Sequence, residues 1–130
     1  MKCKAIYDAA LRLLAESVNP EDNADYEERA PYLIAAFCTE HKDTDARLRE
    51  FLGKTAIPDF ESLYIELDSV FPLLPKLAAC ASLYVAAMLV IDDFPELSDR
   101  LYDRYCDCAS RIYESVLGKS EKTANKYFSN

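Results

Sequence analysis

One stretch of the chain is apolar on every side, between Lys76 and Asp93. No charged residue lies between Lys76 and Asp92. A helix without a polar face must be enclosed by other parts of the protein. The stretch is also shorter than the roughly 20 apolar residues that span a bilayer. We therefore predict that it forms the central helix of a helical bundle, with the rest of the chain packed around it.

The residues before this stretch also show helical spacing of apolar positions. A first helix is predicted over residues 4–17 because apolar residues recur there every three or four positions. A second is expected to begin at residue 23 or 25 and to run to about residue 41. Pro31 marks a kink or a late start in it. Both predicted helices place one apolar stripe toward the central helix.

A shorter third helix is predicted over residues 43–52, with Gly53 as its C-terminal cap. Residues 54–75 are the least regular segment and contain three prolines. Leu63, Ile65 and Leu67 alternate there with polar or aromatic residues, which favours a short extended piece. The same segment also suits a helical turn, so the alternation does not decide between the two.

A last helix is predicted from the turn at Asp93 to about Leu117. Asp93, Pro95 and Glu96 together form a helix start signal, and Gly118 is expected to end the helix. Residues 119–130 then form a short polar C-terminal tail. The fold class predicted is all-α, a bundle of four to five helices around the central apolar one. We expect residues 1–118 to form a single helical domain and residues 119–130 a tail.

The last predicted helix carries two apolar stripes. The stripe that faces the central helix consists of Leu97, Leu101, Tyr105, Cys108, Ile112 and Val116. The second stripe consists of Tyr102, Cys106, Ala109 and Tyr113. Two interpretations stay open. The second stripe packs against another helix of the same chain, or it forms a subunit interface, where tyrosine is enriched.

Composition narrows the possible functions. The 130 residues fit one domain, and 51% of them are hydrophobic, which is enough for a core. The formal charge is −8, so nucleic-acid phosphates and anionic membrane surfaces repel the chain. Only two glycines are present, too few for most phosphate-binding loops. We expect neither sequence-specific nucleic-acid binding nor membrane binding.

Candidate chemistry is sparse. The five cysteines are an odd number and occur mostly within predicted helices, which is typical of reduced thiols in a cytoplasmic protein. Cys38 and His41 share a helical face, but a zinc site needs further ligands, and a nucleophile needs a group to orient the ring. Asp92 and Asp93 are better explained by helix capping. We expect no catalytic residue, cofactor or metal ion, and therefore no enzyme.

The order of these segments resembles a known family. The relevant runs are AIYDAALRLL, ADYEERAPYLIAAFC, LYIELDSVFPL, ASLYVAAMLVIDD and LYDRY, within residues 4–117. They are similar to small helical proteins encoded in the structural gene clusters of tailed phages and prophages of Gram-positive bacteria, the head–tail connector or adaptor proteins. The resemblance lies in apolar pattern and loop positions and includes no catalytic signature.

The resemblance implies a structural role in virion assembly. Connector subunits form a ring beneath the portal, extend the DNA channel and carry the tail, and they catalyse no reaction. An extended terminal segment or loop grips a neighbour, which here implies Tyr127 and Phe128 in the tail and Phe60, Tyr64 and Phe71 in the linker. The expected partners are further copies of the chain and portal or tail proteins, in the host cytoplasm or the virion. The alternative is a cytoplasmic helical module that binds another protein as a regulator or assembly chaperone.

Overall fold

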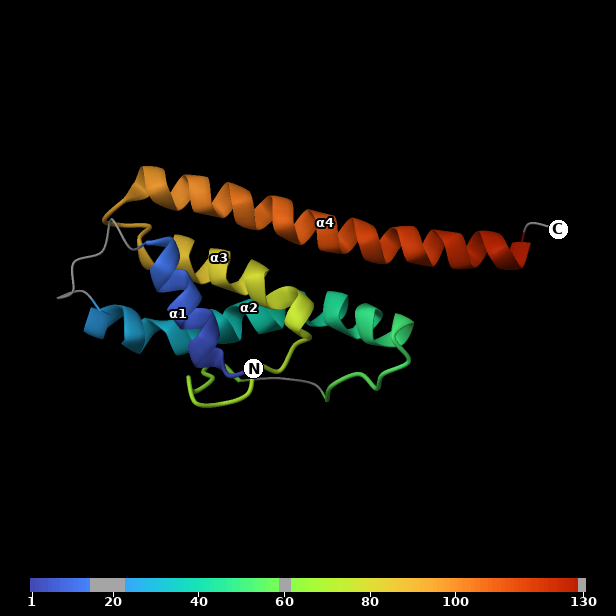
Figure 1. The fold of residues 1–130 in the computed structure, drawn as a ribbon, viewed down its shortest axis with the longest axis horizontal. Helices are drawn as coiled ribbons and strands as arrows, with labels where there is room; N and C mark the ends of the chain where they lie inside the picture. The colour runs from blue at the N-terminus through green and yellow to red at the C-terminus, as the bar shows by residue number, and fades with distance from the viewer. Residues whose placement is uncertain (15–22, 59–61, 129–130) are drawn as a thin grey trace.

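The computed structural model describes residues 1–14, 23–58 and 62–128. These residues form four α-helices and one short 3₁₀-helix (Figure 1): α1 (Cys3–Leu13), α2 (Asn23–Phe51), η2 (Pro75–Leu77), α3 (Ala78–Leu89) and α4 (Pro95–Phe128). The only β-pairing in the described residues is an isolated bridge between Lys2 and Val70. The predicted all-α bundle is confirmed.

Helix α3 is the predicted central helix, and it contacts each of the other three α-helices. Nine of its 12 residues are buried, so packing surrounds it on nearly every side. Most of the buried residues are small, which lets neighbouring helices approach closely. The helix ends at Leu89, earlier than the sequence predicts. Arg29 of α2 lies at this end, where its guanidinium donates to the carbonyl oxygens of Met88 at 3.1 Å and Leu89 at 3.2 Å.

The prediction of two separate helices between residues 23 and 52 is wrong. The structure has one continuous helix, α2, with Pro31 inside it. No proline or glycine interrupts residues 39–45, and the buried face continues from Phe37 and Cys38 to Asp45 and Leu48. Pro31 is therefore not a late start. Its carbonyl oxygen accepts a hydrogen bond from the Ile65 amide at 3.2 Å, which ties the linker to α2.

Gly53 ends α2 as predicted. Its φ of 69° is in the left-handed region, which a glycine enters without steric penalty. The Gly53 amide donates to the Glu50 carbonyl and the Lys54 amide to the Arg49 carbonyl. This pair of bonds is the Schellman motif, which satisfies the last free carbonyl groups of a helix.

Gly118 does not end α4, contrary to the prediction. The helix continues to Phe128, and its C-terminal part extends beyond the other helices (Figure 1). One glycine inside a helix costs about 1 kcal/mol relative to alanine. The good helix formers Lys119, Glu121, Lys122 and Ala124 follow it. The division into a domain ending at residue 118 and a separate tail is therefore not visible in the backbone.

The linker between α2 and α3 has only partly the extended form expected. Residues 67–71 run beside the N-terminus of α1, where the Cys3 amide donates to the Ser69 carbonyl at 2.9 Å and the Lys4 amide to the Leu67 carbonyl at 2.8 Å. These bonds satisfy two of the amides that a helix N-terminus leaves free. The alternation of apolar residues does not define one buried face, because Ile65 is buried while Leu63 is exposed.

Asp45 fixes the end of this linker in place. The side chain is fully buried on α2 and accepts hydrogen bonds from the Leu74 amide at 2.7 Å and from Arg49 Nε at 2.8 Å. Arg49 also donates to the Pro72 carbonyl at 3.2 Å. One ion pair thus holds the chain where it turns into η2 and α3, and this anchors the start of the central helix.

We expect Asp45→Ala to lower the free energy of unfolding by about 3 kcal/mol, because it leaves the Leu74 amide and the Arg49 guanidinium without their acceptor. Urea unfolding followed by circular dichroism measures this. Asp43→Ala is the matched control, since Asp43 is exposed on the same helix. Equal stability of the two variants would show that Asp45 does not anchor the linker.

Ala86→Asp tests whether α3 is the enclosed centre of the bundle. Ala86 is fully buried, so the change places a charge with no partner inside the core. We expect a loss of about 4 kcal/mol or more, enough to unfold most of the protein. Ala79→Asp is the control, because Ala79 is the exposed alanine of the same helix. A melting temperature for Ala86→Asp near that of the wild type would contradict the central position of α3.

Candidate interaction surface on helix α4

Helix α4 presents its predicted core face to α3. Leu101, Tyr105, Ile112 and Val116 are buried, and Leu97 and Cys108 are partly buried against the same core. The helix begins at Pro95, and the Phe94 carbonyl accepts the first helical hydrogen bond from the Ser98 amide. The Ser98 hydroxyl donates to the Ala87 carbonyl of α3 at 2.8 Å. These contacts fix the rotation of α4 about its own axis.

The second apolar stripe lies on one side of this core face and remains open. Tyr102 is 42% exposed and Tyr113 49% exposed, and Cys106 between them is exposed as well. We name these three residues the aromatic edge. Tyr102 rests on Tyr105, with ring centroids 5.4 Å apart. The described part of the chain therefore leaves both tyrosine rings about half uncovered, and the subunit interface predicted there stays a prediction.

The linker residues predicted to contact a neighbour are separated by the structure. Tyr64 is exposed and packs edge-on against Tyr32 of α2, with ring centroids 5.0 Å apart. Phe71 is only 5% exposed and belongs to the core of its own chain, near Phe37. The prediction that Phe71 grips a neighbour is therefore wrong. Phe60 lies outside the described residues.

Tyr127 and Phe128 were predicted to act from an extended tail. The backbone of both residues belongs to the last turn of α4, so they are not in an extended segment. Their side chains lie outside the described part of the structure. Any contact that they make would come from the end of a helix.

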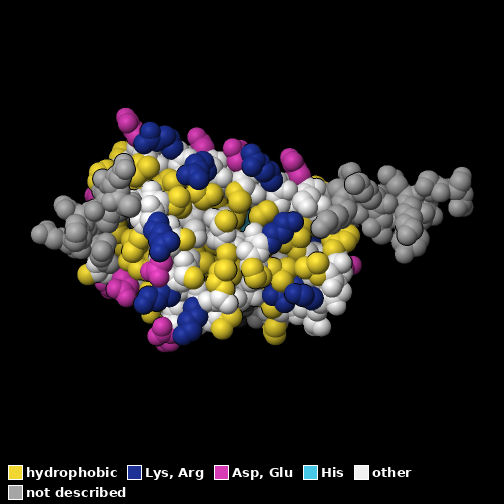
Figure 2. Space-filling view, in the orientation of Figure 1, with side chains coloured by type: hydrophobic (Ala, Val, Ile, Leu, Met, Phe, Trp, Pro, Cys, Tyr) yellow, Lys and Arg dark blue, Asp and Glu magenta, His cyan; other side chains and the backbone are white. Residues whose placement is uncertain are grey.

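The other side of α4 carries a row of arginines that the sequence reading did not single out. Arg100, Arg104 and Arg111 are exposed, and we name them the arginine edge. Figure 2 shows Lys and Arg side chains along α4 on the face toward the viewer, while acidic side chains project at its outer margin. The signal was present as a spacing of four and then seven residues, which keeps all three on one side of a helix.

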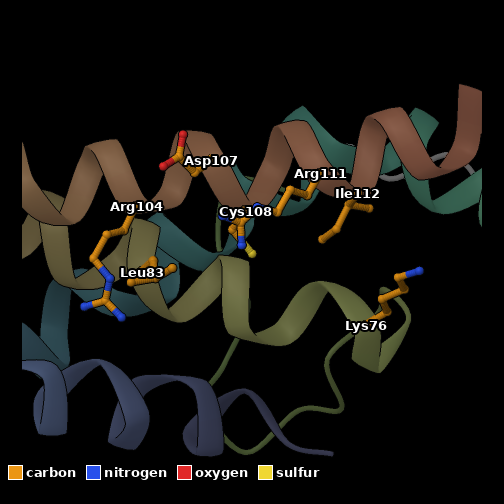
Figure 3. A pocket seen from close by; sticks show the side chains of 7 residues that line it. All are labelled: Lys76, Leu83, Arg104, Asp107, Cys108, Arg111 and Ile112. Atoms are coloured by element: carbon orange, nitrogen blue, oxygen red, sulfur yellow. The ribbon is translucent and has the colours of Figure 1, made fainter.

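A hollow of about 460 Å³ lies below the arginine edge, between α4 and α3 (Figure 3). Arg104 extends from α4 past Leu83 of α3, and Lys76 lies at the opposite end across from Ile112. Asp107 is the one carboxylate among the residues that line the hollow. The hollow therefore combines three cations with an apolar floor, on a chain whose net charge is −8.

A ring cluster lies under the aromatic edge. His41 Nε2 is 2.7 Å from the Tyr105 hydroxyl oxygen, and the His41 ring packs on Phe37 with centroids 4.4 Å apart. Burial raises the pKa of Tyr84 and Tyr105, and the nearby Glu40 carboxylate adds to both shifts. Burial also lowers the pKa of His41, so the neutral imidazole is favoured.

The buried cysteines, Cys3, Cys38 and Cys80, behave as small apolar residues. All five cysteines of the chain are free thiols. Burial raises the pKa of Cys38 and of Cys80 to about 12, so both stay protonated at neutral pH. A nucleophilic cysteine needs the opposite shift. Cys38 and His41 are therefore not arranged as a nucleophile and base, because the thiol is buried and the imidazole is engaged with Tyr105.

Within residues 1–14, 23–58 and 62–128, no group of three or more His, Cys, Asp or Glu side chains could hold a metal ion. No described helix has both the length and the apolar character needed to cross a membrane. Comparison of the chain with protein-family models, curated proteins and solved structures gave no match.

The lowered pKa of His41 predicts how stability depends on pH. Between the folded pKa and the unfolded value of about 6.5, the unfolded chain binds more protons than the folded one. The contribution of neutral, buried His41 to the free energy of unfolding is therefore complete above pH 6.5. It is lost as the pH falls through the pKa of His41 in the folded protein. We expect the free energy of unfolding to fall more between pH 7.5 and 5.5 in the wild type than in His41→Gln. Parallel pH profiles of the two proteins would rule out this linkage.

Proposed function

We propose that this protein is a non-enzymatic structural adaptor, a head–tail connector subunit of a tailed phage or prophage. It acts by binding further copies of itself and the portal or tail proteins beside them. Two things support the proposal. The order of apolar segments over residues 4–117 resembles that family, and α4 exposes an aromatic edge along a helix that reaches past the bundle.

The aromatic edge is the single observation that carries the proposal. Tyrosine is enriched at subunit interfaces because its ring buries a large apolar area while its hydroxyl keeps a polar partner. Tyr102 and Tyr113 stand three helical turns apart on one side of α4, so a flat partner could cover both at once. An isolated surface tyrosine requires no explanation, but an aligned pair with a thiol between them forms a continuous patch.

The free energy that the aromatic edge contributes to association can be compared with the cost of association. Covering the exposed half of each ring contributes about 2 kcal/mol per tyrosine. Association costs about 4–15 kcal/mol in lost translational and rotational freedom. Two rings alone therefore do not hold a stable assembly, and further contacts must act with them. This agrees with an adaptor that is stable as a ring only when many equivalent contacts form together.

The acidic charge fits the same role. A net charge of −8 repels DNA, so a ring of such subunits would let DNA pass through its channel without binding it tightly. The proposed site of action is the host cytoplasm during assembly and afterwards the virion.

The double variant Tyr102→Ala with Tyr113→Ala tests self-association. We expect light scattering over a concentration range to give a higher mass for the wild type than for the variant, with helicity unchanged by circular dichroism. The loss should be about tenfold or more in association constant per ring, from the area each ring buries.

Phe51→Ala is the matched control, because Phe51 is another exposed aromatic residue but lies at the end of α2. We expect it to keep the wild-type mass. A wild-type protein that stays monomeric at every concentration, or an unchanged mass for the double variant, would count against the proposed function.

A further inference from the structure

The two edges of α4 share one spacing. The arginine edge occupies positions 100, 104 and 111, and the aromatic edge occupies positions 102, 106 and 113. Both rows therefore step by four and then seven residues, and each spans about 16 Å along the helix axis. Every member of one row lies two residues, or about 3 Å, from its counterpart in the other. A single axial shift brings all three pairs level.

The edges also face in opposite directions. Two residues correspond to about 200° around a helix, so the arginine edge and the aromatic edge lie on opposite sides of α4. The core face between them is occupied by α3. One copy of α4 can therefore offer its aromatic edge to one neighbour and its arginine edge to another without a clash between the two contacts.

The chemistry of the two rows is complementary. A guanidinium stacks on a tyrosine ring through cation–π attraction, and arginine does this more readily than lysine. The middle pair would set Cys106, which is small, beside Arg104, whose side chain extends toward the hollow below Leu83. A small residue at this position leaves room for the longer side chain opposite.

Formal charges follow this division in part. Asp99 lies beside the aromatic edge on the surface of α4, and Asp103 lies midway between the two edges. Glu40 of α2 lies close to Tyr84 and Tyr105 beneath the aromatic edge. Lys76 lies with Arg104 and Arg111 around the hollow on the other side. Asp107 reduces the positive charge there but does not cancel it. The aromatic side of α4 thus carries only carboxylates, and the arginine side carries more cations than carboxylates, with Asp107 and Glu114 among them.

We propose that the arginine edge of one copy of this protein binds the aromatic edge of the next copy, with their α4 helices side by side and parallel. This rests on the self-association in the proposed function and names the surfaces that produce it. Because the two surfaces differ, the contact is heterologous, and it continues from subunit to subunit, as a ring where the rotation closes and as an open filament where it does not. A contact of one edge with its own copy would stop at a dimer.

A mixing experiment separates these arrangements. The aromatic-edge variant carries Tyr102→Ala and Tyr113→Ala, and the arginine-edge variant carries Arg100→Glu and Arg111→Glu, the two arginines that would stack on those rings. Sedimentation velocity gives the mass of the wild type, of each variant alone and of their equimolar mixture. Arg12→Glu with Arg47→Glu is the control, because both arginines are exposed, lie on α1 and α2, and their substitution changes the charge by the same amount.

We expect the wild type and the control to form species larger than a dimer, and each edge variant alone to be monomeric. The mixture should form 1:1 heterodimers and nothing larger, because only one intact edge of each kind remains available in such a pair. If either edge variant alone forms dimers, or the mixture stays monomeric, the proposed pairing is overturned.

Two further outcomes distinguish this inference from the proposed function. If the wild type self-associates and the arginine-edge variant does so equally well, the pairing of edges is wrong while self-association stands. If the wild type is monomeric at every concentration, the pairing and the self-associating adaptor are both overturned.

Discussion

The structure depends on the enclosure of α3, a helix with no polar face. Such a helix is stable only if neighbours cover every side, so α1, α2 and α4 each give one face to it. Polar groups also join the helices at these contacts: the Ser82 hydroxyl of α3 donates to the Ile6 carbonyl of α1 at 3.3 Å. Arg29 closes the C-terminal end of α3, and the anchor at Asp45 fixes the segment that leads into it.

This constraint also decides which surfaces remain for partners. A helix that covers α3 buries one face in the core. On α4, the aromatic edge and the arginine edge lie on either side of that buried face and are exposed to solvent. The cluster of Phe37, His41 and Tyr105 supports α4 from beneath, so the tyrosines of the aromatic edge stand on a packed base. An interaction surface placed on a rigid helix needs little ordering when a partner binds, which lowers the cost of association.

The sequence predicted the elements that one strong local signal defines. The charge-free stretch located α3, Gly53 located the end of α2, and apolar spacing identified the core face of α4. The sequence did not predict helix boundaries where weak local signals compete with packing. Residues 23–51 form one helix because its buried face continues through Asp45 and Leu48, where two helices were predicted. Gly118 alone does not stop α4, which continues to Phe128. Phe71 was misassigned because a large apolar residue in an irregular segment has the same local signature whether it packs inward or outward.

The arginine edge could not be recognised from the sequence, because its position relative to the buried face of α4 has to be known first. Arg100, Arg104 and Arg111 alternate with aspartates along the chain and have the pattern of an ordinary charged surface. Only the structure shows that the three arginines lie together on one side of the buried face. The net charge of the protein explains why the alignment of these arginines would favour self-association. Copies of a protein with a charge of −8 repel one another as they assemble, so a shared interface must gather cations where the next copy approaches. A row of arginines opposite a row of tyrosines meets this need, because it supplies positive charge and a flat apolar contact in the same place.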